Sequence, residues 1–311
     1  MRKIYTIGET VFDIIFKNLK PYVAKPGGAM LNTSVSLGRL KMPVSFISEY
    51  GNDKFGNFTN DFLISNNVNI NYISKFSVGK TAISLAFLNE NNDAEYDFFK
   101  QYPEERLKQD FPKLNNNDIL LFGSFYSISK EVRDQVMLFV ENSRKSGAII
   151  IYDPNIRKPH KKQINELREF IIRNIAASDI VRASDEDFST IFNVDNPQSA
   201  YEIIKKYNCN NLIYTASNKG VFLFTPKIKK KYPVPKISIV STIGAGDNFN
   251  AGIIYSIIKN SISKTDISNI NEKLFDDIIK YGISFSADVC KSYENYISEK
   301  FVEKLKRSSI L

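Results

Sequence analysis

Short apolar runs alternate with helix-patterned segments along most of this 311-residue chain. This alternation predicts an α/β fold with a mainly parallel central sheet that is covered by helices on both faces. Strands are expected at residues 3–7, 44–48, 118–122, 148–152, 180–183, 211–215, 221–224 and 229–234. Helices are expected at 31–40, 55–64, 130–145, 163–175, 200–206, 246–259 and 272–290, with a short helix after Ser184.

Three strand-like runs break this rhythm, at residues 11–16, 81–88 and 96–100. We expect them to form a small separate sheet that acts as a lid. The whole chain, 1–311, is interpreted as a single domain, with a lid sub-domain built from about 10–22 and 81–108.

Residue counts exclude several mechanisms. The only histidine, His160, lies in a loop rich in Lys and Pro and is interpreted as exposed and inert. A His-based metal site and a Ser-His-Asp or Cys-His hydrolase are therefore excluded. The two cysteines, Cys209 and Cys290, fit neither a disulfide framework nor a zinc site, which favours a cytoplasmic protein. We also expect no signal peptide and no membrane span.

The formal net charge of +8 raises the question of a nucleic-acid partner. The basic residues are scattered, however, and their densest runs, 158–162 and 227–231, are short. We therefore expect solvated basic loops and no nucleic-acid partner.

Residues 241–247, Ser-Thr-Ile-Gly-Ala-Gly-Asp, follow a short apolar segment at 237–240 and open an apolar-faced helix. Small residues let a ligand approach the backbone, and successive amides at a helix start bind anions. A carboxylate there could accept the proton of a hydroxyl that attacks a phosphoryl group. The alternative is a plain Gly-rich turn with Asp247 as a helix cap.

Other polar segments also follow expected strands, and ligands of open α/β sheets bind at the carboxyl ends of the strands. One holds Asp153, Asn155 and Arg157, whose guanidinium suits phosphate or polyol oxygens, although an ordinary Asp-Pro turn explains it equally well. Residues 27–32 form a second Gly-led helix start. Neither a P-loop nor a dinucleotide-binding glycine motif is present.

Taken together, these motifs resemble the ribokinase-like family, also called the phosphofructokinase-B type, over essentially the whole chain. The motifs are, in order, Gly8-Glu9 with Asp13, Gly27-Gly28 with Asn32, Gly51 with Asp53 and Gly56, Asp153-Pro154-Asn155 with Arg157, Ser184 to Asp187, and Gly244-Ala245-Gly246-Asp247. The resemblance implies a three-layer α/β/α sandwich with a small β lid.

The resemblance also implies roles for individual residues. Asp247 would be the catalytic base, and the amides of Gly244, Ala245 and Gly246 would stabilise the transferred phosphoryl group. The sugar would be held by Asp13, Gly28, Asn32, Lys100 and Arg157. The nucleotide would be held by Ser184, Asp187, Thr215, Ser217, Gly220, Ala287, Cys290 and Asn295. ATP would bring Mg²⁺, and no metal site built from protein side chains is expected.

Some positions depart from the family pattern. Ser241 stands where the family usually has Asp, which leaves potassium (K⁺) dependence open. Ser184 to Asp187 replaces the usual Asn-x-x-Glu, as in fructokinase-like members. Phe98-Phe99-Lys100 replaces the Phe-Tyr-Arg of fructokinases, while Gly123 to Tyr126 resembles that branch.

The sequence therefore predicts an ATP-dependent sugar kinase, with fructose as the first candidate substrate. Alternatives in the same family are 2-keto-3-deoxygluconate kinase, ribokinase and nucleoside kinase. A different kind of alternative is an inactive sugar-binding or regulatory member. The resemblance also suggests a homodimer through the lid.

Overall fold

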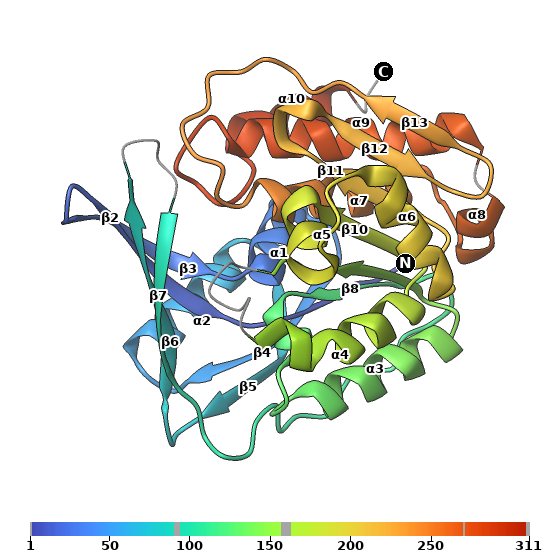
Figure 1. Cartoon of the computed structure of the whole chain (residues 1–311). Coiled ribbons are helices and arrows are strands. Elements are labelled where there is room, and N and C mark those ends of the chain that lie inside the picture. Colours follow the sequence, from blue (N-terminus) through green and yellow to red (C-terminus); the bar gives the residue numbers. More distant parts are fainter. Residues whose placement is uncertain (1, 90–93, 157–162, 270, 309–311) are drawn as a thin grey trace. The chain divides into compact units, whose positions relative to one another are not determined.

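The structure is a computed structural model that describes residues 2–89, 94–156, 163–269 and 271–308 (Figure 1). Its contacts divide the chain into two units, each assembled from three segments. Unit 1 comprises Met1–Ile7, Pro112–Lys236 and Ser256–Lys280, and unit 2 comprises Gly8–Phe111, Ile237–Tyr255 and Tyr281–Leu311.

Unit 1 contains a mainly parallel sheet in the strand order β13-β12-β11-β10-β9-β8-β1. The strands are β1 (Ile4–Ile7), β8 (Ile119–Gly123), β9 (Ile149–Asp153), β10 (Ile180–Ser184), β11 (Leu212–Thr215), β12 (Val221–Phe224) and β13 (Lys229–Tyr232). Neighbours from β1 to β11 pair in parallel, whereas β12 and β13 pair antiparallel. This confirms the predicted mainly parallel sheet.

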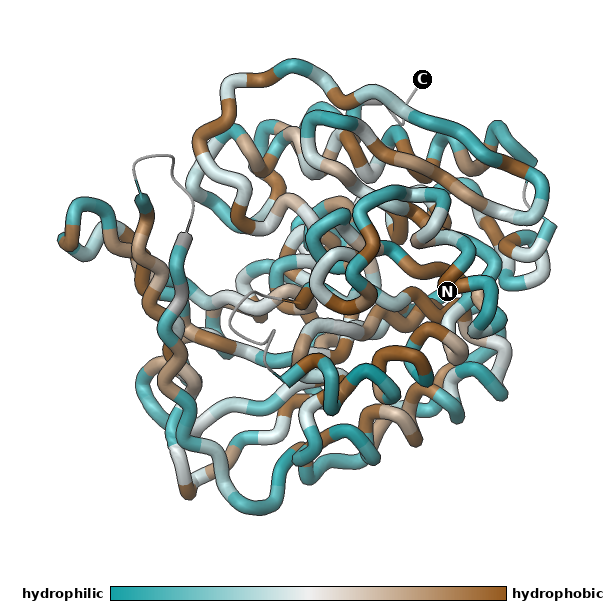
Figure 2. The backbone as a smooth tube through the Cα atoms, in the orientation of Figure 1, coloured by the Kyte–Doolittle hydropathy of each residue, from teal (hydrophilic) through white to brown (hydrophobic). Residues whose placement is uncertain are grey.

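Every residue of β1, β8 and β9 is buried. Continuous apolar runs of this kind are typical of parallel strands that are covered on both faces. Figure 2 shows these central strands as largely hydrophobic segments. The helices of unit 1 are α3 (Arg133–Lys145), α4 (Ile164–Ala176), α5 (Asp185–Phe192), α6 (Pro197–Lys206) and α8 (Lys264–Asn269), with short 3₁₀ turns at Phe125–Ile128 and Ser217–Lys219.

Unit 2 contains the parallel strand pair β4 (Val44–Gly51) and β5 (Asn69–Phe76), and a separate small sheet. The small sheet has the order β3-β2-β6-β7, from β2 (Val11–Lys17), β3 (Lys20–Gly27), β6 (Lys80–Leu88) and β7 (Ala94–Gln101). The helices of unit 2 are α1 (Ala29–Arg39), α2 (Lys54–Ser65) and α10 (Glu299–Ser308). Two helices contribute to both units: α7 (Ala245–Lys259) and α9 (Glu272–Val289).

The small sheet was predicted with three strands, and the structure adds β3 as a fourth. β3 was not predicted because its sequence contains two prolines and a glycine, Lys-Pro-Tyr-Val-Ala-Lys-Pro-Gly, and these residues are depleted in strands. β3 is an edge strand, where proline is tolerated because one row of backbone groups needs no partner.

The register of the small sheet places four residues from its four strands in one line. Asp13 of β2 pairs with Lys25 of β3 on one side and with Ser84 of β6 on the other. Ser84 pairs in turn with Phe98 of β7. Paired residues point to the same face of a sheet. One face therefore carries a row of polar side chains that ends in an aromatic ring.

One expectation about local order is wrong. We expected the chemistry-bearing segments to follow strands, but residues 237–240, which precede α7, form no strand, and the Ile239 side chain is 60% exposed. This segment is held instead by the Cys290 carbonyl, which accepts from the amides of Val240 (2.8 Å) and Ser241 (3.4 Å).

Within the described residues, no helix is both long and apolar enough to cross a membrane.

Candidate active site

The first turn of α7 is reached through a glycine that no other residue could replace without strain. Gly244 has φ +78°, and a Cβ placed on it would lie 2.8 Å from the carbonyl oxygen of Asn295. Only glycine adopts this backbone conformation at little cost. The turn places the first amides of α7 at a helix start, where backbone N–H groups have no partner inside the helix and attract anions. The Ala245 amide donates to the Thr242 carbonyl at 3.2 Å.

The Asp247 carboxylate lies in this first turn and is only 4% exposed. The Asn32 side chain, from α1, donates its Nδ2 hydrogen to Asp247 Oδ2 over 2.8 Å. The Thr33 hydroxyl donates to the Asp247 carbonyl, also over 2.8 Å. The fold thus brings together two predicted site residues that are 215 positions apart, and α1 fixes both the side chain and the backbone of the predicted base.

Two buried amide side chains near this turn have unsatisfied polar atoms. Among the described residues, no partner is found for Asn32 Oδ1, or for either side-chain polar atom of Asn295. A buried polar group without a partner costs about 1–3 kcal/mol. Because both residues were predicted to bind a ligand, these free atoms are where a substrate group could be received.

The start of α1 shows why the sequence has two glycines there. A Cβ on Gly27 would lie 1.9 Å from Asp13 Oδ2, so the Asp13 carboxylate rests against this backbone. A Cβ on Gly28, where φ is +123°, would lie 2.3 Å from the Glu9 carbonyl oxygen. The structure therefore brings Asp13, Gly28 and Asn32 together at one helix start.

Lys100 is paired with an acid that sequence reasoning did not single out as its partner. Lys100 Nζ lies 2.6 Å from Glu9 Oε1, which also accepts from the Tyr102 hydroxyl at 2.7 Å. The guanidinium of Arg106 lies 3.5 Å from the centre of the Tyr102 ring. Arg106 in turn forms a buried ion pair with Glu49, whose second oxygen accepts from the Leu107 amide at 2.8 Å.

Sequence reasoning missed Tyr102, Arg106 and Glu49, because only the tertiary pairing of β4 with the segment after β7 reveals them. It also missed Lys25, which is 7% exposed. Lys25 Nζ donates to the Tyr293 carbonyl. Burial lowers the pKa of Lys25, although Glu294 and Asp13 act in the opposite direction. A buried lysine beside Asp13 could only have been found by predicting β3.

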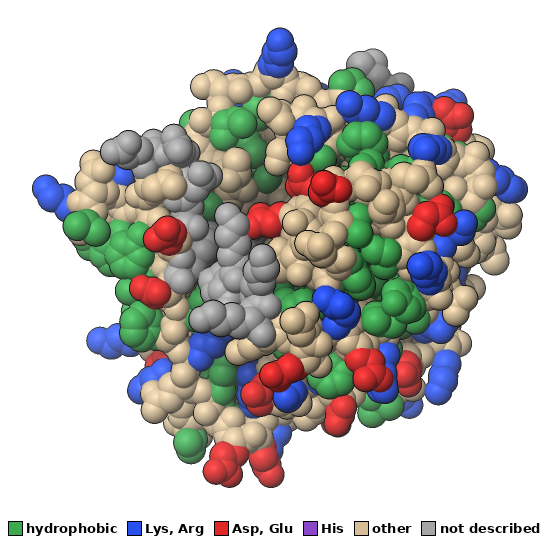
Figure 3. Space-filling view, in the orientation of Figure 1, with side chains coloured by type: hydrophobic (Ala, Val, Ile, Leu, Met, Phe, Trp, Pro, Cys, Tyr) green, Lys and Arg blue, Asp and Glu red, His purple; other side chains and the backbone are tan. Residues whose placement is uncertain are grey.

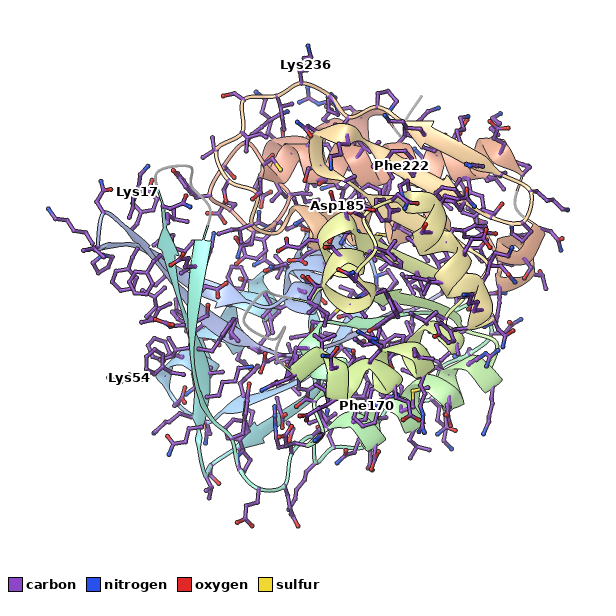
Figure 4. The ribbon with its side chains drawn as sticks, viewed as in Figure 1. Lys17, Lys54, Phe170, Asp185, Phe222 and Lys236 are labelled. Carbon is purple, nitrogen blue, oxygen red and sulfur yellow. The ribbon has the colours of Figure 1, made fainter. Side chains whose placement is uncertain are left out.

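In unit 1, Ser184 and Asp187 form a reciprocal capping box at the start of α5. The Ser184 hydroxyl accepts from the Asp187 amide at 3.0 Å, and Asp187 Oδ2 accepts from the Ser184 amide at 2.8 Å. Asp187 Oδ1 accepts from the Ile156 amide at 2.8 Å. Figure 4 labels Asp185, the first residue of this helix.

Arg182 of β10, which sequence reasoning also missed, joins the ends of the two strands that flank β10, namely β9 and β11. Its guanidinium donates to Asp153 Oδ2 at 3.0 Å and to the Thr215 hydroxyl at 2.8 Å. Thr215 was a predicted nucleotide ligand. Ser217 begins the 3₁₀ turn after β11, and Gly220 follows it with φ +106°.

Arg157 and His160 lie outside the described residues. Ala287 is half-buried on α9, and Cys290 is buried at its end. Burial raises the pKa of the Cys290 thiol, so it is not a thiolate nucleophile at neutral pH. Ser241 is buried, and its hydroxyl accepts from the Ile243 amide at 3.2 Å, which orders the loop without a carboxylate.

The charged groups of the described residues offer no ready metal site. No cluster of three or more His, Cys, Asp or Glu side chains that could hold a metal ion is found among them. On the face shown in Figure 3, basic and acidic side chains are intermixed rather than gathered into one patch. The site holds the buried carboxylates of Asp13 and Asp247, a turn of backbone amides, and a polar sheet face.

Comparisons with known proteins identify similar sequences and similar folds. Residues 1–297 match the profile of the pfkB family carbohydrate kinases. Aminoimidazole riboside kinase of Salmonella typhimurium is 23% identical over 83% of this chain and 81% of its own. Fructokinase-2 of Zea mays is 25% identical over 89% of this chain and 82% of its own. A solved structure of a fructokinase double mutant from Vibrio cholerae, bound to fructose, ADP and a potassium ion, superposes with a TM-score of 0.84 at 20% identity, covering 98% of each chain.

Proposed function

The chain belongs to the pfkB family of carbohydrate kinases, and from this premise we propose that it transfers the γ-phosphate of ATP to the terminal hydroxyl of a small sugar, with fructose as the first candidate. The observation that carries the proposal is the contact between Asn32 and Asp247 beside the Gly244 turn. It combines a buried carboxylate, a side-chain amide with an unpartnered oxygen, and backbone N–H groups at a helix start within unit 2.

In this proposal, Asp247 accepts the proton of the attacking hydroxyl. Phosphoryl transfer needs chiefly positioning and charge stabilisation, and a positioned carboxylate is the usual proton acceptor. The amides of Gly244, Ala245 and Gly246 bind the equatorial oxygens of the transferred group. Asn32 holds Asp247 through Nδ2 and keeps Oδ1 available for a sugar hydroxyl.

The sugar is proposed to lie against the polar face of the small sheet. Asp13 accepts from sugar hydroxyls, Gly28 lets the ligand approach the start of α1, and Lys100, with Arg157, contacts the remaining oxygens. Fructose is favoured because fructokinases recur among the relatives. The main rival, aminoimidazole riboside, is favoured by the similarity to the Salmonella typhimurium kinase. 2-Keto-3-deoxygluconate, ribose and nucleosides are further substrates to test.

For the nucleotide, we propose the eight residues that were predicted from the resemblance, from Ser184 to Asn295. The unpartnered Asn295 side chain supports this set, because a buried amide with free donors and acceptors suits a polar ligand. Mg²⁺ is proposed to arrive with ATP, bound mainly by phosphate oxygens and water. Ser241 brings no charge to its loop, so dependence on K⁺ is left to be tested by kinetics with and without the ion.

The proposal also covers assembly and location. The small sheet and its hairpin expose large hydrophobic side chains, namely Leu19, Tyr22 and Phe99, which a homodimer through this sheet would cover. Both cysteines are free thiols, as is usual in the cytoplasm, where we place the enzyme. No nucleic-acid or membrane partner is proposed.

The test is coupled ADP release with Mg-ATP against a panel of free sugars and nucleosides. Turnover with fructose above all other acceptors supports the proposal in full. Turnover of another acceptor supports the proposal of a kinase but shows that fructose is not its preferred substrate. Binding of sugar or ATP without turnover of any acceptor would instead support an inactive, sugar-binding member of the family.

A further inference from the structure

Asn248, the residue after Asp247, has a fully buried side chain (0% exposed) that joins three segments of unit 2. Its Nδ2 donates to the Gly244 carbonyl at 2.8 Å and to the Asn295 carbonyl at 2.7 Å. Its Oδ1 accepts from the Ser36 hydroxyl of α1. One amide group thereby connects the glycine turn, the loop after α9, and α1.

The partners of Asn248 are themselves held in place. The Ser36 hydroxyl accepts from the Ile297 amide at 3.1 Å. The Gly244 carbonyl also accepts from the Asn248 backbone amide at 2.9 Å, which is the first helical hydrogen bond of α7. Both hydrogens and the oxygen of the Asn248 side chain are therefore used in a closed network.

The network acts where Gly244 and the Asn295 backbone are closest. A Cβ on Gly244 would lie 2.8 Å from the same Asn295 carbonyl oxygen that accepts from Asn248. The Asn248 side-chain amide therefore donates to both carbonyls at this contact, those of Gly244 and Asn295. The direction of the Gly244 turn depends on that contact, and so does the aim of the amides that follow it.

α1 contacts successive groups of the first turn of α7 through three of its side chains. Asn32 holds the Asp247 carboxylate, Thr33 holds the Asp247 carbonyl, and Ser36 holds the Asn248 amide. The spacing from 32 to 36 is one helical turn, so these side chains lie on one face of α1. This face of α1 therefore positions both the predicted proton acceptor, Asp247, and the turn that carries the backbone amides.

We propose that Asn248 is a positioning residue, which fixes the Gly244–Gly246 amides in the orientation needed to stabilise the transferred phosphoryl group. The inference rests on the proposed function, because it assigns the network a role in phosphoryl transfer. Donors that are preorganised in this way stabilise developing charge without reorganising during the reaction. Loss of the network is therefore expected to lower kcat more than it weakens ground-state binding.

The test compares Asn248→Asp and Asn248→Ala with the wild type and with a matched control. Asn248→Asp keeps an oxygen for Ser36 but replaces the Nδ2 donor with an oxygen that faces the carbonyls of Gly244 and Asn295. Asn248→Ala removes both functions and provides a second variant if the Asp variant does not fold. The control is Asn174→Ala in α4, where a fully buried amide bonds to Arg133 and Ser127.

We expect Asn248→Asp to lower kcat about 10²-fold, within the range for loss of preorganised donors, while the KM values for sugar and ATP change little. The affinity for aluminium fluoride together with ADP and sugar, a mimic of the transferred phosphoryl group, should fall by a similar factor. Asn174→Ala should lower Tm but leave kcat and this affinity unchanged.

Unchanged kcat in folded Asn248 variants of an active enzyme overturns the inference and leaves the proposed function intact. A parallel change in kcat, in the KM values and in Tm, matched by Asn174→Ala, also overturns it, because the residue would then be merely structural. A wild type that phosphorylates no acceptor overturns the proposed function, and the inference with it.

Discussion

The starts of α5 and α7 follow the same local pattern but use it differently. Each helix carries an aspartate as its third residue, Asp187 in α5 and Asp247 in α7. In α5 the acid bonds to the residue before its own helix, Ser184, and to the Ile156 amide. In α7 the acid bonds to Asn32, on a helix 215 positions away in sequence.

The residue before each helix explains the difference. Ser184 has a hydroxyl that accepts from the Asp187 amide, so its side chain caps the helix start. Gly244 has no side chain that could do so, and its positive φ turns the backbone sharply into α7. A capped start stabilises its own helix, whereas an uncapped start leaves amides that can bind an anion.

The largest expected effect comes from removing the acid of α7. We expect Asp247→Asn to lower kcat about 10²–10⁴-fold, the usual contribution of a positioned proton acceptor. The fold should be retained because Asn can still accept from Asn32 Nδ2. Steady-state kinetics and circular dichroism measure the two effects. Near-normal turnover in a folded variant would show that Asp247 is not the base and serves as a helix cap.

The second prediction changes the start of α7 toward that of α5. Gly244→Ser introduces a side chain where φ is +78° and where the Asn295 carbonyl lies 2.8 Å from the new Cβ. We expect kcat to fall about 10²-fold, because the amides are displaced or capped. The matched control is Gly147→Ala in unit 1, where φ is +84° and Asn116 Oδ1 lies 2.5 Å from the new Cβ.

Both variants should be less stable, so Tm alone does not separate them. Measuring kcat at a temperature well below the Tm of either variant separates the two effects. If Gly147→Ala loses as much kcat for each degree of lost Tm as Gly244→Ser does, the glycine before α7 has only a conformational role.

The third prediction concerns the acid of α5. Asp187→Ala removes three hydrogen bonds that the carboxylate accepts, two from Ser184 and one from the Ile156 amide, and should cost about 0.5–2 kcal/mol of stability. Because the carboxylate is engaged by these donors, we expect kcat to change far less than in Asp247→Asn. Chemical denaturation and ATP kinetics measure both. A rise in the KM for ATP beyond what the stability loss explains would support the predicted direct contact with the nucleotide.

These two helix starts also show what the sequence could reveal. The Gly-Ala-Gly-Asp segment, the Gly27-Gly28 pair and the capping pattern at Ser184 are local signals, since each depends on backbone sterics or on neighbouring residues. The alternation of apolar runs likewise predicted the mainly parallel sheet of unit 1.

The missed features all depend on pairing between distant segments. Glu49 and Arg106 are 57 positions apart, and neither lies in a distinctive local pattern. Lys25 acquires its buried place beside Asp13 only because β3 pairs with β2. The strands β3 and β5 were missed because proline, or polar residues on exposed positions, weakened their apolar alternation.

The smallest expected effect comes from a third helix start, at α2. Asp53 is its N-cap and accepts from the Gly56 amide at 2.9 Å, and from the Thr81 amide and hydroxyl at 2.8 Å each. Burial acts to raise the pKa of Asp53, but these donors outweigh it and hold that pKa below its ordinary value. The ionised carboxylate therefore ties α2 to β6.

A lowered folded-state pKa means that the unfolded chain binds the proton more readily. The stability contributed by Asp53 is thus fully present above the ordinary carboxyl pKa of about 3.9 and is lost as the pH falls through the lower folded-state value. We expect Asp53→Asn to cost about 1 kcal/mol at pH 7 and progressively less toward acid pH. The control is Asp195→Asn, whose side chain is exposed.

Urea denaturation of the wild type and both variants between neutral and acid pH tests this. A difference between wild type and Asp53→Asn that stays constant with pH would show that shape, not charge, makes Asp53 a cap. A difference that shrinks on acidification would place α2 with α5, as a helix start whose acid serves the fold. Asp247, bonded to another helix beside an uncapped glycine turn, would then be the exception among the three.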